Sequence, residues 1–118
     1  MAKILVVDDS TFVRLRTARL LQAAGHQVIE AATGQAAVDA YVLERPDAVL
    51  MDITMPEMDG LEALDQIRTL DPSAKVAMLS AIGQQSVVMD AIRRGAREFL
   101  VKPFAADPFF RAVGRLLR

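Results

Sequence analysis

The sequence predicts an α/β fold in which five strands alternate with five helices in a single domain over residues 1–118. Two observations support this prediction. Five short apolar runs are almost continuous in hydrophobic character, as expected for parallel strands that are covered on both faces. The segments between them carry apolar residues at helical spacing, which favours a doubly wound (βα)5 architecture with a mainly parallel sheet. The predicted strands are Ile4–Val7, Gln27–Ala31, Ala48–Met51, Lys75–Leu79 and Glu98–Val101.

Capping residues bound the first two predicted helices. The first runs from Thr11 to Ala24, with Ser10 as its N-cap and Gly25 in the left-handed position after its last turn. The second runs from about Gln35 to Glu44, follows Thr33 as N-cap and ends before a proline. We expect the first helix to turn four residues inward, namely Val13, Thr17, Leu20 and Ala24.

The remaining three helices have similar signals. The third begins near Gly60 and ends near the Asp71-Pro72 turn, and the fourth covers about Gln84–Arg94 and is terminated by Gly95. The fifth is expected to begin with Asp107 as N-cap and the following proline at the first helical position. The inward residues of the third helix are Leu61, Leu64 and Ile67, and those at helical spacing in the fifth are Phe109, Phe110, Val113, Leu116 and Leu117.

The composition excludes several classes of function. The absence of cysteine rules out disulfide frameworks, cysteine metal sites and thiol nucleophiles, and a single histidine, His26, rules out a multi-histidine metal site. The net charge of -1 gives no sign of nucleic-acid binding by this domain. No apolar run approaches the roughly 20 residues of a membrane span. We therefore expect a soluble cytoplasmic protein.

The candidate functional residues are those that follow the strands, because ligands of open α/β sheets bind beyond the carboxyl ends of the strands. Asp8 and Asp9 follow the first strand, Asp52 the third, Ser80 the fourth and Lys102 the fifth. Three carboxylates brought together would raise one another's pKa unless a cation offsets the repulsion. Mg²⁺ suits such oxygen ligands, and the lysine adds a second positive charge. A site of this kind is suited to receiving a phosphoryl group on a carboxylate.

Four stretches in this order resemble the signature stretches of response-regulator receiver domains: ILVVDDS, MDITMPEMDG, MLSA and FLVKPF. The segments SAIGQQ and VKPF are similar to the CheY family of single-domain chemotaxis regulators. The resemblance covers essentially the whole chain and implies that residues 1–118 form a receiver (response regulatory) domain. It also implies a flavodoxin-like sheet with the strand order 2-1-3-4-5.

The resemblance assigns roles to the acidic residues. Asp52 is the expected acceptor that forms the aspartyl phosphate, and it is also a ligand of Mg²⁺. Asp9 is the expected direct Mg²⁺ ligand, and Asp8 is expected to hold the waters of the metal. The residue two positions after the acceptor, Thr54, would offer its backbone carbonyl to the metal.

The resemblance also assigns roles to residues of the fourth and fifth strands. Lys102 would pair with the phosphoryl oxygens and Ser80 would hydrogen-bond one of them, while Phe99 would be the aromatic switch that turns inward as Ser80 moves. The Lys102–Pro103 bond is expected to be cis. Ile82, two residues beyond Ser80, is apolar and is expected to slow the approach of water to the phosphoryl group.

The implied partners are those of a two-component system. The phosphodonor would be a phosphohistidine on a sensor histidine kinase of the chemotaxis type, and acetyl phosphate should also serve. Phosphorylation would switch the face made by the fourth helix, the fifth strand and the fifth helix (the α4-β5-α5 face of the family). A downstream protein such as a component of the flagellar-motor switch would bind there, a phosphatase is a possible further partner, and a monomer is expected.

Other functions compete with that of a phospho-accepting chemotaxis regulator. A phosphatase of the haloacid-dehalogenase kind would need a second acid where Thr54 stands, so we expect no turnover on separate substrates and no enzyme in that sense. A flavin or nucleotide carrier is disfavoured because there is neither a P-loop nor a GxGxxG motif. A docking-only receiver, a phosphorelay intermediate and a receiver from a longer DNA-binding regulator remain alternatives.

Several of the candidate site residues also have a simpler structural explanation. Asp8 and Asp9 could cap the first helix, Ser80 could simply end a strand, and Phe99 could be a core residue. We expect the arginines of the first helix to form a solvated face, namely Arg14, Arg16 and Arg19.

Overall fold

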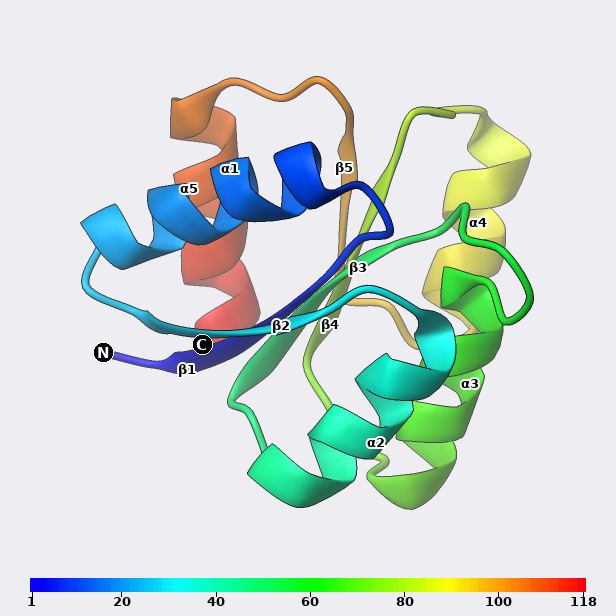
Figure 1. Cartoon of the computed structure of the whole chain (residues 1–118). Helices are drawn as coiled ribbons and strands as arrows, with labels where there is room; N and C mark the ends of the chain where they lie inside the picture. Colours follow the sequence, from blue (N-terminus) through cyan, green and yellow to red (C-terminus); the bar gives the residue numbers. More distant parts are fainter.

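Five parallel strands form one sheet in the order β2-β1-β3-β4-β5, as predicted (Figure 1). The computed structural model describes residues 1–118. The chain passes from β1 outward to β2 and then returns across β1 to β3. The strands are β1 (Lys3–Val7), β2 (Gln27–Ala31), β3 (Ala48–Asp52), β4 (Val76–Ser80) and β5 (Glu98–Val101).

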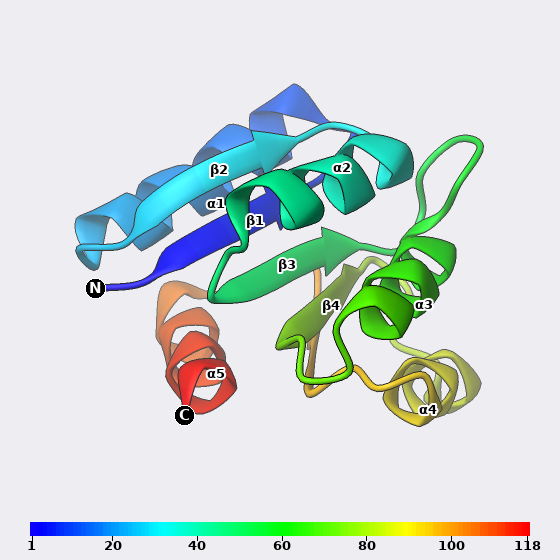
Figure 2. The ribbon, with the colours of Figure 1, turned by 90° about the horizontal axis from the view of Figure 1, so that it is seen from below.

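Helices cover both faces of the sheet, which confirms the doubly wound arrangement (Figures 1 and 2). The helices α1 and α5 lie over one face, and α2, α3 and α4 lie over the other. They are α1 (Thr11–Ala23), α2 (Gly34–Glu44), α3 (Gly60–Leu70), α4 (Gln85–Arg93) and α5 (Ala106–Leu117).

The core consists of two apolar layers because successive residues of a strand point to opposite faces. In β1, Leu5 and Val7 pack in the layer under α2, α3 and α4, whereas Ile4 and Val6 pack in the layer under α1 and α5. All four side chains are almost completely buried. This burial on both faces is the physical reason for the continuous apolar runs in the sequence.

The capping predictions for the first helices are confirmed. The hydroxyl of Ser10 accepts a hydrogen bond from the N–H of Val13, and that of Thr33 accepts one from the N–H of Ala36. Gly25 follows α1 with a φ of 88°. Such a left-handed conformation suits glycine because it has no Cβ.

The predicted inward face of α1 is wrong in part. Thr17 is buried, but Val13 and Leu20 are only partly buried, and Ala24 is exposed. The helix ends at Ala23, so Ala24 is the C-cap and lies outside the last turn. The buried residues of α1 are Thr17, Ala18 and Leu21.

The predicted N-cap of α5 is also wrong. Ala105 is the N-cap and makes no side-chain hydrogen bond, and Asp107 already lies in the first turn. Pro108 fits within that turn because the first N–H groups of a helix have no intrahelical partner. Phe109 is fully buried and Phe110 is half-buried, with their rings in edge contact at 5.7 Å between centroids.

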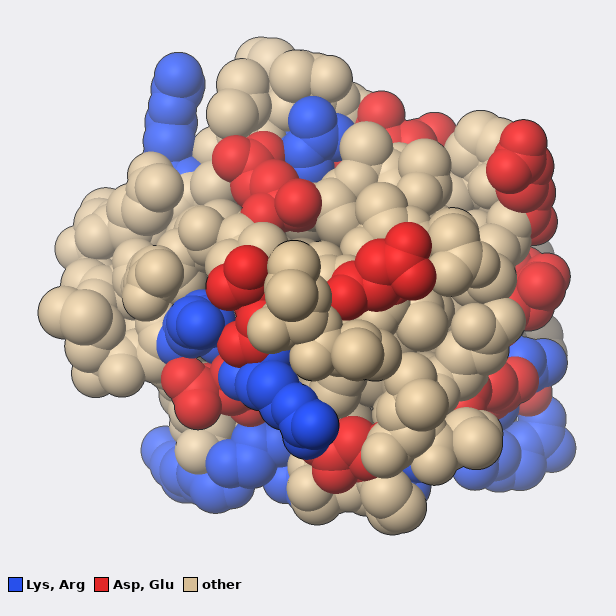
Figure 3. Space-filling view, turned by 60° about the horizontal axis from the view of Figure 1, so that its bottom comes forward, with Lys and Arg blue, Asp and Glu red and all other residues tan.

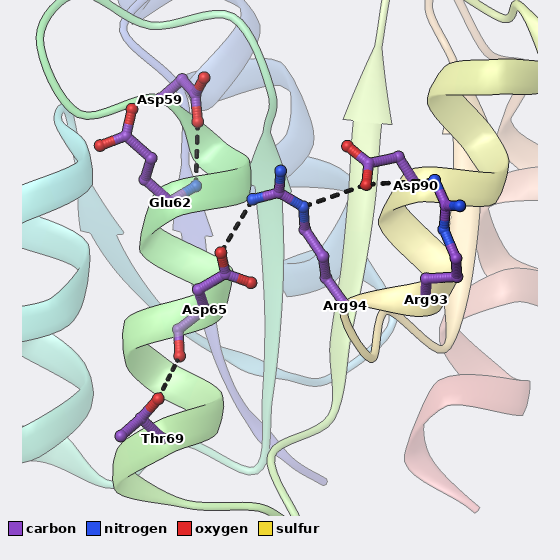
Figure 4. A network of polar contacts seen from close by, with 7 residues as sticks. All are labelled: Asp59, Glu62, Asp65, Thr69, Asp90, Arg93 and Arg94. Carbon is purple, nitrogen blue, oxygen red and sulfur yellow. Dashed lines mark hydrogen bonds and ion pairs between the residues drawn. The ribbon is translucent and has the colours of Figure 1, made fainter.

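The helix α4 buries few residues, and an ion pair joins its C-terminal end to α3 (Figure 4). Its only buried residue is Ala91. The C-cap, Arg94, lies 2.8 Å from a carboxylate oxygen of Asp65 on α3 and 3.3 Å from one of Asp90 on α4. An element with few buried apolar contacts costs little free energy to displace.

The surface shows no expanse of a single charge on the face drawn in Figure 3. Acidic and basic side chains are interspersed there, and basic side chains gather along the lower edge of the view. None of the helices combines the length and the hydropathy needed to cross a bilayer.

A buried hydroxyl joins α2 to the end of α3. The hydroxyl of Tyr41 donates a hydrogen bond of 2.7 Å to Asp71. Burial, together with this hydrogen bond, raises the pKa of Tyr41 well above its ordinary value. The hydrogen bonds from Ser73 and then from Tyr41 lower the pKa of Asp71 below its ordinary value.

We expect Tyr41→Phe to lower the free energy of unfolding by about 1 kcal/mol at pH 7, the typical net value of one hydrogen bond. The pKa of Asp71 is lower in the folded state than in the unfolded state. The stability that the ionised Asp71 gains from the hydrogen bond of Tyr41 is therefore complete above the unfolded pKa of about 3.9, and it is lost as the pH falls through the folded pKa. Urea unfolding of both proteins between pH 7 and pH 3 measures the difference. A difference that does not shrink at low pH would contradict the role of the ionised carboxylate.

Candidate functional site

The residues predicted from the strand ends lie together at the carboxyl edge of the sheet. Asp8 and Asp9 follow β1, and Asp52 is the last residue of the neighbouring strand β3. Ser80 is the last residue of β4, and Lys102 follows β5. The strands β1 and β3 are adjacent although β2 separates them in sequence, so the acids lie where the order of the sheet reverses, a usual ligand position in such folds.

The three carboxylates form a compact cluster. Their oxygen atoms lie within 4.8 Å of one another. Asp8 and Asp52 are buried, with exposed fractions of 2% and 5%, whereas Asp9 is exposed. Ionised groups at such separations repel one another strongly, above all where water is excluded.

The ammonium of Lys102 bridges the two buried acids. Its Nζ atom lies 2.9 Å from Oδ2 of Asp8 and 3.1 Å from Oδ1 of Asp52. Its backbone N–H donates a hydrogen bond of 2.8 Å to the carbonyl of Ser80, so the start of the loop after β5 is attached to the end of β4. The Lys102–Pro103 peptide bond is cis, as predicted.

The pKa values reflect this balance of burial and charge. Burial raises the pKa of Asp52, and the hydrogen bond from Lys102 opposes the shift while Asp8 and Asp9 add to it. For Lys102, burial lowers the pKa, but the hydrogen bonds to Asp8 and Asp52 outweigh it and the pKa is raised. The lysine therefore stays charged at neutral pH, and a further positive charge near Asp52 would favour its ionised form.

The chemistry of the donor set fits a hard divalent cation. All three side chains offer carboxylate oxygens, and no histidine or cysteine lies in the cluster. Such oxygen donors suit Mg²⁺, Ca²⁺ or Mn²⁺ rather than metals that prefer nitrogen or sulfur. The cluster could therefore hold a metal ion beside the positive charge of Lys102.

Ser80 is buried and its hydroxyl has a local partner. The Oγ atom accepts a hydrogen bond of 3.0 Å from the N–H of Ile82 in the loop before α4. The side chain of Ile82 is 47% exposed. This contact ties the position of Ser80 to the β4–α4 loop.

Two other predicted residues lie further from the cluster of side chains. Thr54 is exposed in the loop after β3, two residues beyond Asp52. Phe99 is partly buried on β5 and packs against the core layer under α2, α3 and α4. The roles assigned to both by resemblance stay predictions.

Sequence reasoning missed the constraint at Gly60. Its N–H donates a hydrogen bond of 2.7 Å to the carbonyl of Ile53, and a Cβ at this position would collide with the carbonyl oxygen of Asp52. Glycine therefore lets the start of α3 approach β3 closely. The Asp-Gly pair at the helix start was visible in the sequence, but the close approach depends on the tertiary fold.

The prediction of a solvated arginine face on α1 is wrong for Arg14. Its side chain is only 15% exposed and contacts both the backbone of Asp8 and the carboxylate of Glu30. Arg16 also has partners, since it donates to the carbonyl of Phe104 and lies over the ring of that residue.

Comparison with known proteins gives consistent matches. A family model, that of the response regulator receiver domain, matches residues 4–114. The chemotaxis protein CheY of Listeria monocytogenes is 52% identical over 114 residues, which is 96% of both chains. CheY of Bacillus subtilis is 48% identical over 116 residues, 98% of this chain and 97% of the relative.

A solved structure extends the comparison to the fold. The crystal structure of the CheX-CheY-BeF3-Mg²⁺ complex from Borrelia burgdorferi matches with a TM-score of 0.95 and 35% identity. The match covers 98% of this chain and 89% of that chain. These similarities extend over all of the strand-end residues described above.

Proposed function

This chain belongs to the family of response regulator receiver domains, and we propose that it is a phospho-accepting regulator of chemotaxis with Asp52 as the acceptor. The observation that carries the proposal is that the buried Asp52 contacts Lys102 and belongs to the same carboxylate cluster as Asp8 and Asp9. A buried carboxylate that has a cation and a metal-holding cluster beside it can attack phosphorus without accumulating uncompensated charge.

In the proposed reaction a carboxylate oxygen of Asp52 forms a bond to phosphorus while the bond between phosphorus and the donor nitrogen or oxygen breaks. The leaving group takes the electron pair, and the product is an aspartyl phosphate. Lys102, already 3.1 Å from Asp52, would pair with the phosphoryl oxygens. The donor would be a phosphohistidine of a chemotaxis-type sensor kinase, or a small acyl phosphate.

The proposed metal is Mg²⁺, and the Borrelia structure named above also contains it. Asp9 and Asp52 would be its side-chain ligands, Asp8 would orient its waters, and Thr54 would offer a backbone carbonyl. When bound, the ion would supply positive charge to the transferring oxygens. The protein would assist its own phosphorylation but would not turn over separate substrates, because Thr54 occupies the position where a phosphatase of similar architecture needs a second acid.

Phosphorylation would act on the face made by α4, β5 and α5. The Ser80 hydroxyl, which accepts a hydrogen bond from the N–H of Ile82, would move inward and donate one to a phosphoryl oxygen, and Phe99 would turn inward as the loop moves. Because only one residue of α4 is buried, a displacement of this helix is inexpensive. Several half-exposed apolar residues line α4 and its neighbouring loop and strand, namely Ile82, Met89, Ile92 and Val101.

The proposed partners follow from this face and from the relatives. A flagellar-motor switch component would bind the phosphorylated form, by analogy with the chemotaxis proteins that the chain resembles. A phosphatase is a further candidate, because the Borrelia relative was solved in a complex with CheX.

The first test is the intact mass of the protein after incubation with acetyl phosphate. We expect one added phosphoryl group in the presence of Mg²⁺, almost none with a chelator, and none in Asp52→Asn. Asp107→Asn, which removes an exposed carboxylate from α5, is the matched control and should be phosphorylated like the wild type. An adduct that persists in Asp52→Asn would show that another residue is the acceptor.

The second test concerns the lifetime of the phosphoryl group. We expect Ile82→Glu to accelerate autodephosphorylation by about tenfold, because a carboxylate can hold and orient the attacking water that the apolar side chain excludes. Loss of the phosphoryl group is followed by mass after removal of the donor. Val42→Glu introduces the same charge on α2 at a side chain that is 53% exposed and should leave the rate unchanged. Equal rates in Ile82→Glu and the wild type would remove the proposed effect of Ile82.

A further inference from the structure

Arg14 connects the acidic turn to two other elements of the fold. Its Nη1 atom donates a hydrogen bond of 2.7 Å to the backbone carbonyl of Asp8. Its Nε atom donates one of 3.0 Å to the carboxylate of Glu30 on β2. Since Arg14 is the fourth residue of α1, one guanidinium ties together the end of β1, the helix and the edge strand.

The carbonyl that Arg14 holds belongs to the peptide bond between Asp8 and Asp9. A peptide group is planar, so fixing its oxygen also restricts the direction in which the next residue leaves. Asp8 has three further restraints: its N–H donates to the carbonyl of Ala31, its Oδ1 accepts from the N–H of Ser10, and its Oδ2 accepts from Lys102.

Asp9 differs from Asp8 in this respect. Its side chain is exposed and takes part in none of the hydrogen bonds or ion pairs of the structure, although it belongs to the cluster that could hold a metal. Its direction therefore depends on the backbone that precedes it. The contact from Arg14 restrains the peptide before Asp9, whereas the bond from the Ser10 N–H to the Asp8 carboxylate restrains the peptide after it.

We propose that Arg14 is a positioning residue for the metal site, which it orients through the Asp8–Asp9 peptide, and that Glu30 holds Arg14 in place. This inference rests on the proposed function, in which Asp9 is a Mg²⁺ ligand. Arg14 itself reaches the backbone and not the carboxylates of the cluster. The planar fork of the guanidinium can satisfy the carbonyl and Glu30 together, which a lysine ammonium cannot do in the same way.

The experiment measures the dissociation constant of Mg²⁺ alone by isothermal titration calorimetry on the full chain. We expect the constant to rise about tenfold in Arg14→Ala, the lower end of the loss seen when residues that orient metal ligands are removed. Arg14→Lys should bind Mg²⁺ with intermediate affinity. At saturating Mg²⁺, both Arg14 variants should be phosphorylated by acetyl phosphate at close to the wild-type rate, because Arg14 does not contact the carboxylate of Asp52 or Lys102.

Arg115→Ala is the matched control. Arg115 on α5 also bridges a helix to a strand, but far from the acidic turn in sequence. Its Nε and Nη2 atoms lie 3.1 and 2.9 Å from the carboxylate of Glu98 on β5. Its loss should leave the Mg²⁺ affinity unchanged. Urea unfolding of each variant shows whether a change in affinity accompanies a loss of stability, and where Arg14→Ala does not fold, Glu30→Gln and Arg14→Lys provide the comparison.

The outcomes separate this inference from the proposed function. If the wild type binds Mg²⁺ and the folded Arg14 variants bind it equally well, the positioning role is wrong and the proposed function stands. The same holds if Arg115→Ala weakens binding as much as Arg14→Ala, since the effect would then be one of general stability. If the wild type binds no Mg²⁺, both the positioning role and the metal in the proposed function are wrong.

Discussion

The contact of one lysine with two buried carboxylates is the interaction on which the site depends. Burying ionised groups is costly, and the cost is offset only where opposite charges and hydrogen bonds are close. Lys102 supplies one positive charge to Asp8 and Asp52, but the cluster holds three acids. The carboxylates therefore outnumber the cations of the site, a condition that favours a bound cation, and the proposed phosphoryl transfer would depend on that added charge.

The order of the sheet brings this arrangement about. Because β1 lies beside β3 and β4 lies between β3 and β5, the acids and the lysine approach from both sides of Asp52. The local backbone then completes the geometry: Gly60 allows α3 to begin against β3, and Arg14 holds the turn that carries the other two acids. Ser80 links this edge to the loop before α4, a helix with one buried residue.

The fold and most of the site could be predicted because the signals are local. Apolar runs that are buried on both faces stop where polar residues begin, so Asp52 and Lys102 were visible as the ends of strands. The structure places both within one cluster. The contacts of Arg14 could not be predicted, because its spacing on α1 suggested a solvated face and its partners, the Asp8 carbonyl and Glu30, are brought to it by the tertiary fold. The start of α5 was misplaced for a related reason: a proline is accepted anywhere in a first turn, so Pro108 did not define the cap.

Unfolding of Lys102→Met with and without Mg²⁺ tests the charge balance most directly. Methionine keeps much of the length of the side chain and removes its charge. The account predicts that the variant is less stable than the wild type without Mg²⁺, and that the ion raises its free energy of unfolding by more than it raises that of the wild type, because ligand binding to the folded state stabilises it. A variant that is as stable as the wild type and gains no more from Mg²⁺ would show that Lys102 does not balance the acids, and would contradict the account.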